Sequence, residues 1–144
     1  MKAISKIVLV LMATIYLGGC ATGPKFAEIS PSLGAVAPDI GRIYVYRTAV
    51  LGAALQPEVK LNGEVVGKAV PNGFFYVDQE PGNYKIATST EVDRHLSLAL
   101  EKGQTRYVRL NISMGFFVGH VYPELVENED GEKEIQQCSY TGQK

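Results

Sequence analysis

Apolar and polar residues alternate along most of the chain after residue 40. The alternation first appears in GRIYVYR at residues 41–47 and returns in four later segments: PEVKLNGEVVGKAV, GFFYVDQEPGNYKIATS, HLSLALEKGQTRYVRLNIS and GHVYPELVEN. A period of two is typical of β-strands that bury one face. Short turn sequences separate the segments, among them Asn62-Gly63 and Lys102-Gly103-Gln104. The pattern predicts an all-β fold, an antiparallel β-sandwich of seven to eight strands within residues 41–144.

The leucines of one predicted strand show why a second sheet is needed. Leu96, Leu98 and Leu100 share one face of their strand, while Ser97 and Ala99 share the other. Because an apolar face must be covered, a second sheet packed on the first is the simplest arrangement.

The Asn62-Gly63 turn allows two registers for the hairpin around it. A two-residue loop places Leu61 opposite Glu64, whereas a three-residue loop places Lys60 opposite Glu64. We favour the three-residue loop because it sets opposite charges across from each other and pairs Val59 with a valine.

The first twenty residues follow a different pattern. Lys2 and Lys6 precede an apolar stretch at residues 7–17, and small residues then lead to Cys20. A membrane-spanning helix needs about 20 apolar residues, so this stretch is too short. A positive start, a short apolar segment and small residues are typical of a secretory signal peptide, which we place at residues 1–19.

The residues Leu17-Gly18-Gly19-Cys20 resemble the bacterial lipobox. The resemblance implies cleavage before Cys20, a diacylglyceryl group on its sulfur and an acyl chain of the palmitate type on its amino group. Two or more acyl chains give stable membrane attachment. Ala21 follows the cysteine in place of Asp, which by resemblance to enteric lipoproteins implies lipid anchoring in the outer membrane, facing the periplasm. A secreted protein without lipid is the alternative.

Residues 20–40 show no sustained period of 2 or 3.6. They contain three prolines and two glycines among small residues, with little apolar bulk. We therefore expect the lipidated cysteine to be followed by a flexible tether that reaches on the order of 25 Å. The tether would keep the domain of residues 41–144 close to its own membrane.

Composition and charge narrow the choice of partners. The chain has 144 residues and a net charge of −1, and without residues 1–19 it keeps twelve Lys and Arg against fifteen Asp and Glu, a net charge of −3. No basic patch for nucleic acid follows from this balance.

With Cys20 lipidated, Cys138 has no partner within the chain. We expect a buried, inert thiol, with a disulfide between two chains as the alternative.

Several quoted segments carry a resemblance to a family. GRIYVYR, VKLNGEVVGKAVPNGFFYVDQEPGNYKIA and LEKGQTRYVRLNISMGFFVGH together resemble bacterial envelope lipoproteins with the domain of unknown function 2846. The resemblance covers the chain from Gly41 to Cys138. It implies an immunoglobulin-like or transthyretin-like sandwich in the cell envelope, and the hairpin and PGNY turn resemble PEGA-type β modules. It implies no established activity.

The sequence offers little to catalysis. His95 and His120 stand 25 residues apart without a metal-ligand spacing, and no Gly-x-Ser-x-Gly motif is present. The acidic run ENEDGEKE at residues 127–134 does not fit an EF-hand, because residue 137 is Gln where the ligand Glu would stand. We predict a solvated hairpin turn around Asp130-Gly131 instead. No catalytic residue, metal site or cofactor is predicted, and the protein is not expected to be an enzyme.

Two pairs of adjacent phenylalanines are candidates for a binding surface. Phe74-Phe75 and Phe116-Phe117 each place one ring on either face of a strand, so either both faces are covered or one docks a partner. Five tyrosines and four nearby arginines suggest glycan binding as an alternative: Tyr44, Tyr46, Tyr76, Tyr84 and Tyr107, with Arg42, Arg47, Arg106 and Arg109. We expect a non-catalytic binding or assembly module of the envelope, with an envelope protein as partner. The alternative partner is peptidoglycan or lipopolysaccharide.

Overall fold

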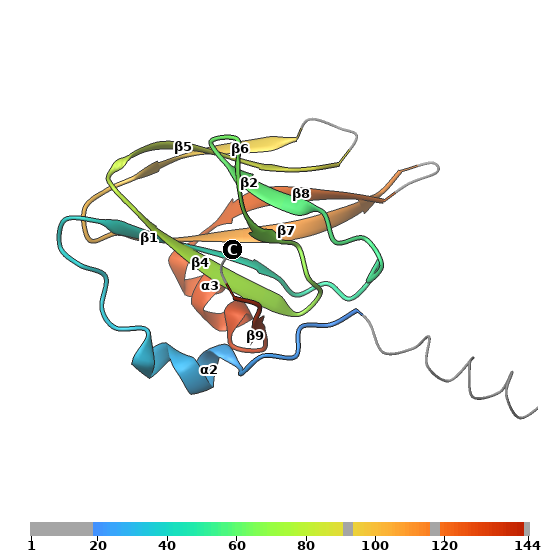
Figure 1. Cartoon of the computed structure of the whole chain (residues 1–144), viewed down its shortest axis with the longest axis horizontal. Coiled ribbons are helices and arrows are strands. Elements are labelled where there is room, and N and C mark those ends of the chain that lie inside the picture. Colours follow the sequence, from blue (N-terminus) through green and yellow to red (C-terminus); the bar gives the residue numbers. More distant parts are fainter. Residues whose placement is uncertain (1–18, 91–93, 116–118, 143–144) are drawn as a thin grey trace, which may run out of the picture.

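The fold is a β-sandwich with two helices on one outer side (Figure 1). The structure is a computed structural model and describes residues 19–90, 94–115 and 119–142. One sheet has five strands in the order β8-β7-β1-β4-β9, and the other has four in the order β3-β2-β5-β6. The all-β sandwich predicted from the alternation is therefore confirmed.

The described residues form nine strands and three short helical segments. In chain order these are α2 (Phe26–Ile29), η2 (Ser30–Ser32), β1 (Gly41–Arg47), β2 (Glu58–Leu61), β3 (Glu64–Lys68), β4 (Gly73–Gln79), β5 (Gly82–Thr88), β6 (His95–Leu100), β7 (Thr105–Met114), β8 (Gly119–Val126), α3 (Asn128–Ile135) and β9 (Ser139–Tyr140).

Two pairs of neighbouring strands run parallel, which the expected antiparallel pattern did not include. β1 pairs with β7 in parallel, and β4 pairs with β9 in the same way. The residues between β1 and β7 include the whole four-stranded sheet, so the chain crosses to that sheet before it returns beside β1. β9 contributes only two residues, and its place beside β4 makes it the edge of the five-stranded sheet.

The main core lies between the two sheets. Ile43 and Val45 of β1 point into it, and so does Phe75 of β4. The four-stranded sheet contributes Leu98 and Leu100, whose shared face was predicted from the alternation. This core is what the period-two pattern builds, because each strand places every second residue on the inner face.

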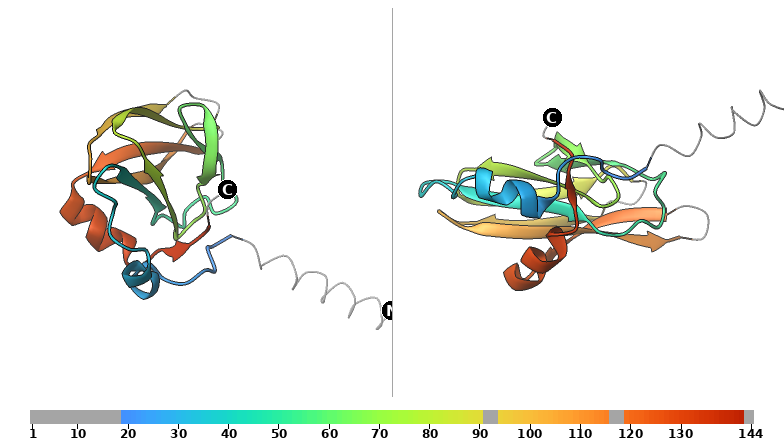
Figure 2. Two further views of the ribbon diagram at one scale, coloured as in Figure 1. Left: turned by 60° about the vertical axis from the view of Figure 1, so that its left-hand side comes forward. Right: turned by 90° about the horizontal axis from the view of Figure 1, so that it is seen from below.

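A second core covers the other face of the five-stranded sheet. Tyr44, Tyr46 and Phe74 point toward α2 and α3, where they pack with Phe26 and Ile135. Figure 2 shows both helices on the side of the five-stranded sheet. Because this sheet is covered on both faces, all seven residues of β1 are buried.

The predicted hairpin turn around Asp130-Gly131 is wrong, because these residues lie inside helix α3. Gly131 is buried, and the ring of Tyr107 occupies the space that a Cβ atom on Gly131 would need. Glycine therefore serves close packing of the helix on β7, not a turn. Glu129 and Asp130 lie in the first turn, where carboxylates interact favourably with the helix dipole.

The favoured register of the β2–β3 hairpin is also wrong. Leu61 pairs with Glu64, so the loop has two residues, Asn62 and Gly63, both with positive φ. Such a turn matches the twist of the strands. Leu61 is buried in the main core, and its burial outweighs an exposed pair between Lys60 and Glu64.

The segment before β1 is part of the folded domain. Phe26 of α2 is buried against the rings of Tyr44 and Phe74, with centroid distances of 5.4 and 5.2 Å. The Nη1 group of Arg42 donates a hydrogen bond to the carbonyl oxygen of Gly34 at 3.3 Å. The expectation of a flexible tether over residues 20–40 is therefore wrong for most of this stretch, since an aromatic side chain and backbone contacts hold it on the sheet.

Candidate functional site

Cys20 is exposed on the surface of the domain, and the residues beside it are fixed. The backbone N–H of Ala21 donates to the carbonyl oxygen of Pro71 at 3.0 Å, and the Nε2 group of Gln56 donates to the carbonyl oxygen of Gly19 at 2.9 Å. The sulfur is therefore accessible at a defined point of the domain. Of the predicted cleavage motif, Leu17 and Gly18 lie outside the described residues.

The chain after Cys20 is held by the last strand of the fold. The backbone N–H of Tyr140 in β9 donates to the carbonyl oxygen of Pro24 at 2.8 Å. The backbone N–H of Phe26 donates to the carbonyl oxygen of Cys138 at 3.0 Å. The Nζ group of Lys25 donates to the carbonyl oxygen of Gln137 at 2.7 Å. The stretch from Gly23 to Phe26 thus lies along the C-terminal strand.

Buried Arg47 fixes the loop at residues 48–56, which lies next to Gly19. Its five N–H groups donate to the carbonyl oxygens of Ala49, Leu51, Gly52, Leu55 and Ala69 at 2.6 to 3.0 Å. A guanidinium group has five N–H donors, so none is left unsatisfied. Burial lowers the pKa of Arg47, but an arginine stays charged at any physiological pH.

The second cysteine is enclosed by the fold. Cys138 is buried, and its Sγ–H group contacts the carbonyl oxygen of Arg47 at 3.8 Å. Burial raises the pKa of the thiol to about 12. These observations agree with the expected inert thiol, because a disulfide between two chains requires an accessible sulfur.

The predicted docking surface is wrong for Phe74 and Phe75. The two rings do point to opposite faces of β4, but Phe74 is 0% and Phe75 is 1% exposed. The main core covers one ring and the helices cover the other. Phe116 and Phe117 lie outside the described residues.

Three of the five tyrosines suggested for glycan binding do not lie on the surface. Tyr44, Tyr46 and Tyr107 are buried under the two helices, where they belong to the second core. Burial raises the pKa of Tyr46 and Tyr107 above the ordinary value of a phenol. The prediction that these three rings line a binding face is therefore wrong.

The arginines of the same group bind partners within the domain. Arg42 forms an ion pair with Asp78 at 2.6 Å, and its guanidinium group lies over the ring of Tyr76. Arg109 pairs with Glu124 at 2.8 Å and with Glu134 of α3 at 2.7 Å. These contacts join neighbouring strands and fix helix α3 to the sheet.

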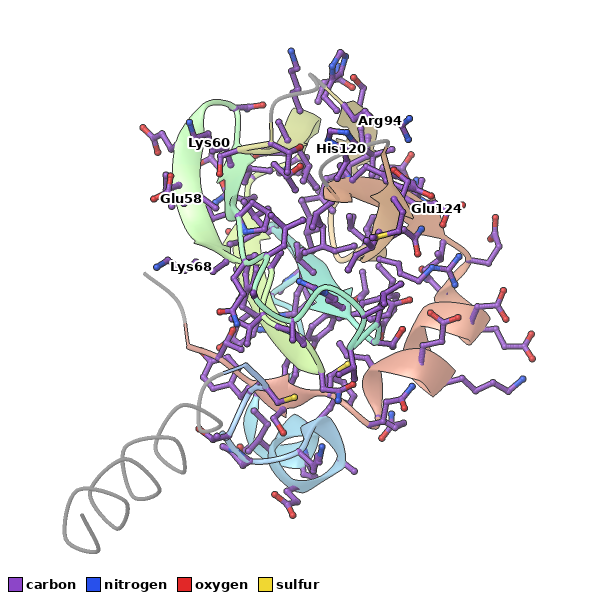
Figure 3. The ribbon with its side chains drawn as sticks, turned by 90° about the vertical axis from the view of Figure 1, so that its right-hand side faces the viewer. Glu58, Lys60, Lys68, Arg94, His120 and Glu124 are labelled. Carbon is purple, nitrogen blue, oxygen red and sulfur yellow. The ribbon has the colours of Figure 1, made fainter. Side chains whose placement is uncertain are left out.

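The outer face of the four-stranded sheet is the open sheet face of the domain as described. Lys85 of β5 and Ser97 and Ala99 of β6 point outward and are exposed. Figure 3 shows Glu58, Lys60 and Lys68 of the neighbouring strands pointing away from the body of the domain. A hollow of about 280 Å³ is lined by Leu61, Asn62, Glu64, Val66 and Tyr84 of the four-stranded sheet and its first hairpin, and by Gln79 of β4 in the other sheet.

The described residues contain neither a cluster suited to a metal ion nor a helix suited to crossing a membrane. Within residues 19–90, 94–115 and 119–142, no three His, Cys, Asp or Glu side chains are grouped so that they could bind a metal ion. Over the same ranges, no helix has the length and apolar character that crossing a membrane requires.

Comparison with known families identifies the domain. A family model described as "Protein of unknown function (DUF2846)" matches residues 38–121, which is more than half of the chain. The chain belongs to the DUF2846 family. A curated protein of Haemophilus influenzae named "Uncharacterized protein" is 30% identical to this DUF2846 chain over 136 residues, with 90% of the chain and 80% of the relative covered. No solved structure matches the chain.

Proposed function

We propose that the protein is a lipoprotein that Cys20 anchors in the outer membrane, with its β-sandwich in the periplasm as a non-catalytic binding or assembly module. The observation that carries this proposal is the exposed Cys20, directly after a short apolar segment and the Leu17-Gly18-Gly19 motif. Acyl chains on its sulfur and amino group would have a free path away from the domain.

The segment at residues 21–33, which we call the docked segment, lies on the domain and so changes the expected distance between the domain and the membrane. A flexible tether would let the domain move on the order of 25 Å away. Here Ala21 is bonded to Pro71, and Phe26 is buried in the second core, so Cys20 lies at the domain surface. An acylated Cys20 would therefore hold the domain directly against the bilayer.

The binding role is assigned to the open face of the four-stranded sheet. The five-stranded sheet is covered by α2 and α3, so its faces are taken up by the fold. Among the described residues, no helix or strand covers the outer face of the four-stranded sheet, which presents Lys85, Ser97 and Ala99 and so leaves room for a partner. We propose an envelope protein as this partner, since three of the five rings suggested for glycan stacking, those of Tyr44, Tyr46 and Tyr107, are buried.

Lipid attachment is tested with cells that express the full chain and are labelled with an alkyne analogue of palmitate. The intact protein should carry the label, fractionate with the outer membrane and begin at Cys20 in mass spectrometry of its N-terminal peptide. The Cys20→Ala variant should lose both the label and the membrane association. Cys138→Ala is the matched control and should retain both, because its thiol is buried. An unlabelled wild-type protein would refute the anchor.

The binding face is tested by a photo-crosslinking residue placed at Lys85 or Ser97 in living cells. A discrete crosslinked product from these positions is the expected result. The control position is Glu129 on α3, which is exposed on the other side of the molecule. Identical products from Glu129 and Lys85 would refute a specific face, and a product that lysozyme treatment releases would show a glycan partner instead.

A further inference from the structure

Large apolar side chains are exposed mainly at one end of the described domain. Val50 is 49%, Leu51 is 65% and Met114 is 70% exposed, while Leu125 is 37% exposed further along β8. Val50 and Leu51 belong to the loop at residues 48–56, and Met114 is the last residue of β7. Exposed apolar side chains that gather at one site indicate a surface for a partner or a lipid.

The loop and the end of β7 touch each other. A Cβ atom on Gly52 of the loop would lie 3.5 Å from the Ile112 Cδ1 atom, and one on Gly119 would lie 3.4 Å from the Leu55 Cδ2 atom. Met114 pairs with Gly119 across the β7–β8 hairpin. Val50, Leu51 and Met114 therefore belong to one end of the sandwich, which we call the apolar end.

Cys20 lies at this same end. A Cβ atom on Gly19 would be 3.4 Å from the Ala53 Cβ atom of the loop, and Gly19 accepts the hydrogen bond from Gln56 at the end of the loop. In Figure 1 the start of the described chain, the loop after β1 and the end of β7 all lie on the right-hand side. The residue proposed to carry acyl chains is thus at the same end of the sandwich as the exposed apolar side chains.

The loop is held in its exposed form. Arg47 donates hydrogen bonds to three carbonyl groups at or beside the tip of the loop, those of Ala49, Leu51 and Gly52. A loop with free backbone groups would be able to turn its apolar side chains inward. Here the buried guanidinium group fixes the backbone, so Val50 and Leu51 remain outside the core.

We propose that Val50, Leu51 and Met114 enter the interfacial region of the bilayer in which the acyl chains of Cys20 are inserted. This inference rests on the proposed lipid attachment and adds a defined orientation, with the apolar end toward the membrane. The bilayer is the occupant because the anchor keeps it next to these side chains at a high effective concentration. Apolar groups of an interfacial segment are buried about 5–10 Å into the boundary between headgroups and acyl chains.

The absence of tryptophan from the sequence allows a direct test. Leu51→Trp and Met114→Trp each introduce one tryptophan at the apolar end, and Leu125→Trp is the matched control six residues along β8 from Gly119. The lipidated variants are reconstituted into phosphatidylcholine and phosphatidylglycerol vesicles, with or without bromine atoms high on the acyl chains. Bromine should reduce the emission at residues 51 and 114, as an interfacial depth of about 5–10 Å implies, and leave the control unchanged.

Each outcome has one meaning. Emission from residues 51 and 114 that bromine leaves unchanged, in vesicles that retain the protein, overturns the orientation but not the anchor. If the tryptophan of Leu51→Trp becomes shielded from solvent only when a second protein is added, the proposed orientation is also overturned, and the apolar end is assigned to that protein. Purified protein without acyl mass that does not remain with the vesicles overturns both proposals.

Discussion

Gly131 of helix α3 lies directly against the ring of Tyr107 on β7, where a Cβ atom would overlap the ring. This close approach lets α3 cover the second core, and it is supported by the ion pair between Arg109 and Glu134 at 2.7 Å. The Tyr46 hydroxyl donates a hydrogen bond to the same glutamate at 2.7 Å. Helix α3 is therefore fixed to the sheet by one apolar and one polar contact region.

Gly131→Ala should lower the free energy of unfolding by about 1–3 kcal/mol, because the added methyl group forces the helix away from Tyr107. Urea denaturation followed by far-UV circular dichroism measures the change. Glu132→Ala, at the exposed next position of the helix, is the control and should leave the midpoint almost unchanged. Equal midpoints for the two variants would contradict the close packing.

Arg47→Lys should destabilise the domain by about 3 kcal/mol. Lysine has three donors where Arg47 uses five, so buried carbonyl groups of the loop would lose their partners. Arg94→Lys makes the same exchange at an exposed position and should have little effect on thermal unfolding. If both variants have the same melting temperature as the wild type, the five hydrogen bonds of Arg47 do not fix the conformation of the loop at residues 48–56.

Phe26→Ala should release the segment around Cys20 from the sheet. The ring packs edge-on against Tyr44 and Phe74, and its loss should lower the unfolding free energy by about 3 kcal/mol. Limited trypsin digestion gives a local readout, since cleavage after Lys25 should become faster than in the wild type. Leu51→Ala removes an exposed apolar side chain and should leave that cleavage rate unchanged. A protected Lys25 in Phe26→Ala would show that the backbone contacts alone hold the segment.

Cys138 should make the free energy of unfolding fall as the pH rises above about 9. Burial raises the pKa of the folded thiol from 9.0 to about 12, so the neutral thiol favours the folded state. This contribution is complete below pH 9.0, the ordinary value, and is lost as the pH rises toward the folded value. Cys138→Ala should therefore show a smaller loss of stability between pH 9 and 11 than the wild type, measured by urea denaturation in a Cys20→Ala background.

A thiol reagent gives an independent measurement of the same burial. In the Cys20→Ala background, Ellman's reagent should react with Cys138 slowly in buffer and rapidly in denaturant. Fast reaction in the native state would mean that the thiol is accessible. Such a result would reopen the possibility of a disulfide between two chains.

The strands were predictable because their signal is local. In β1 and β6 a period of two places alternate side chains in the main core, and the sequence contains that period directly. The presence of a second covered face was harder to predict. Phe74 and Phe75 left two interpretations open, and only the position of the helices decides between them.

Helix α3 and the docked segment were missed for physical reasons that differ. Asp130-Gly131 has the composition of a turn, but contact with Tyr107, distant in sequence, gives the glycine another role. In the docked segment, Phe26, Ile29 and Leu33 have a helical spacing that would have indicated a packed face. The role of Arg47 has no sequence signal, because its acceptors are backbone carbonyl groups brought together by the fold.

The pairing of residues 24–26 with residues 138–140 brings early and late parts of the chain together. Synthesis proceeds from the N-terminus, so β9 leaves the ribosome long after the segment it binds. The region around Cys20 therefore completes its contacts only when nearly the whole polypeptide has been made. A premature stop before Ser139 would leave that region without its partner strand, even though most of both sheets had already been made.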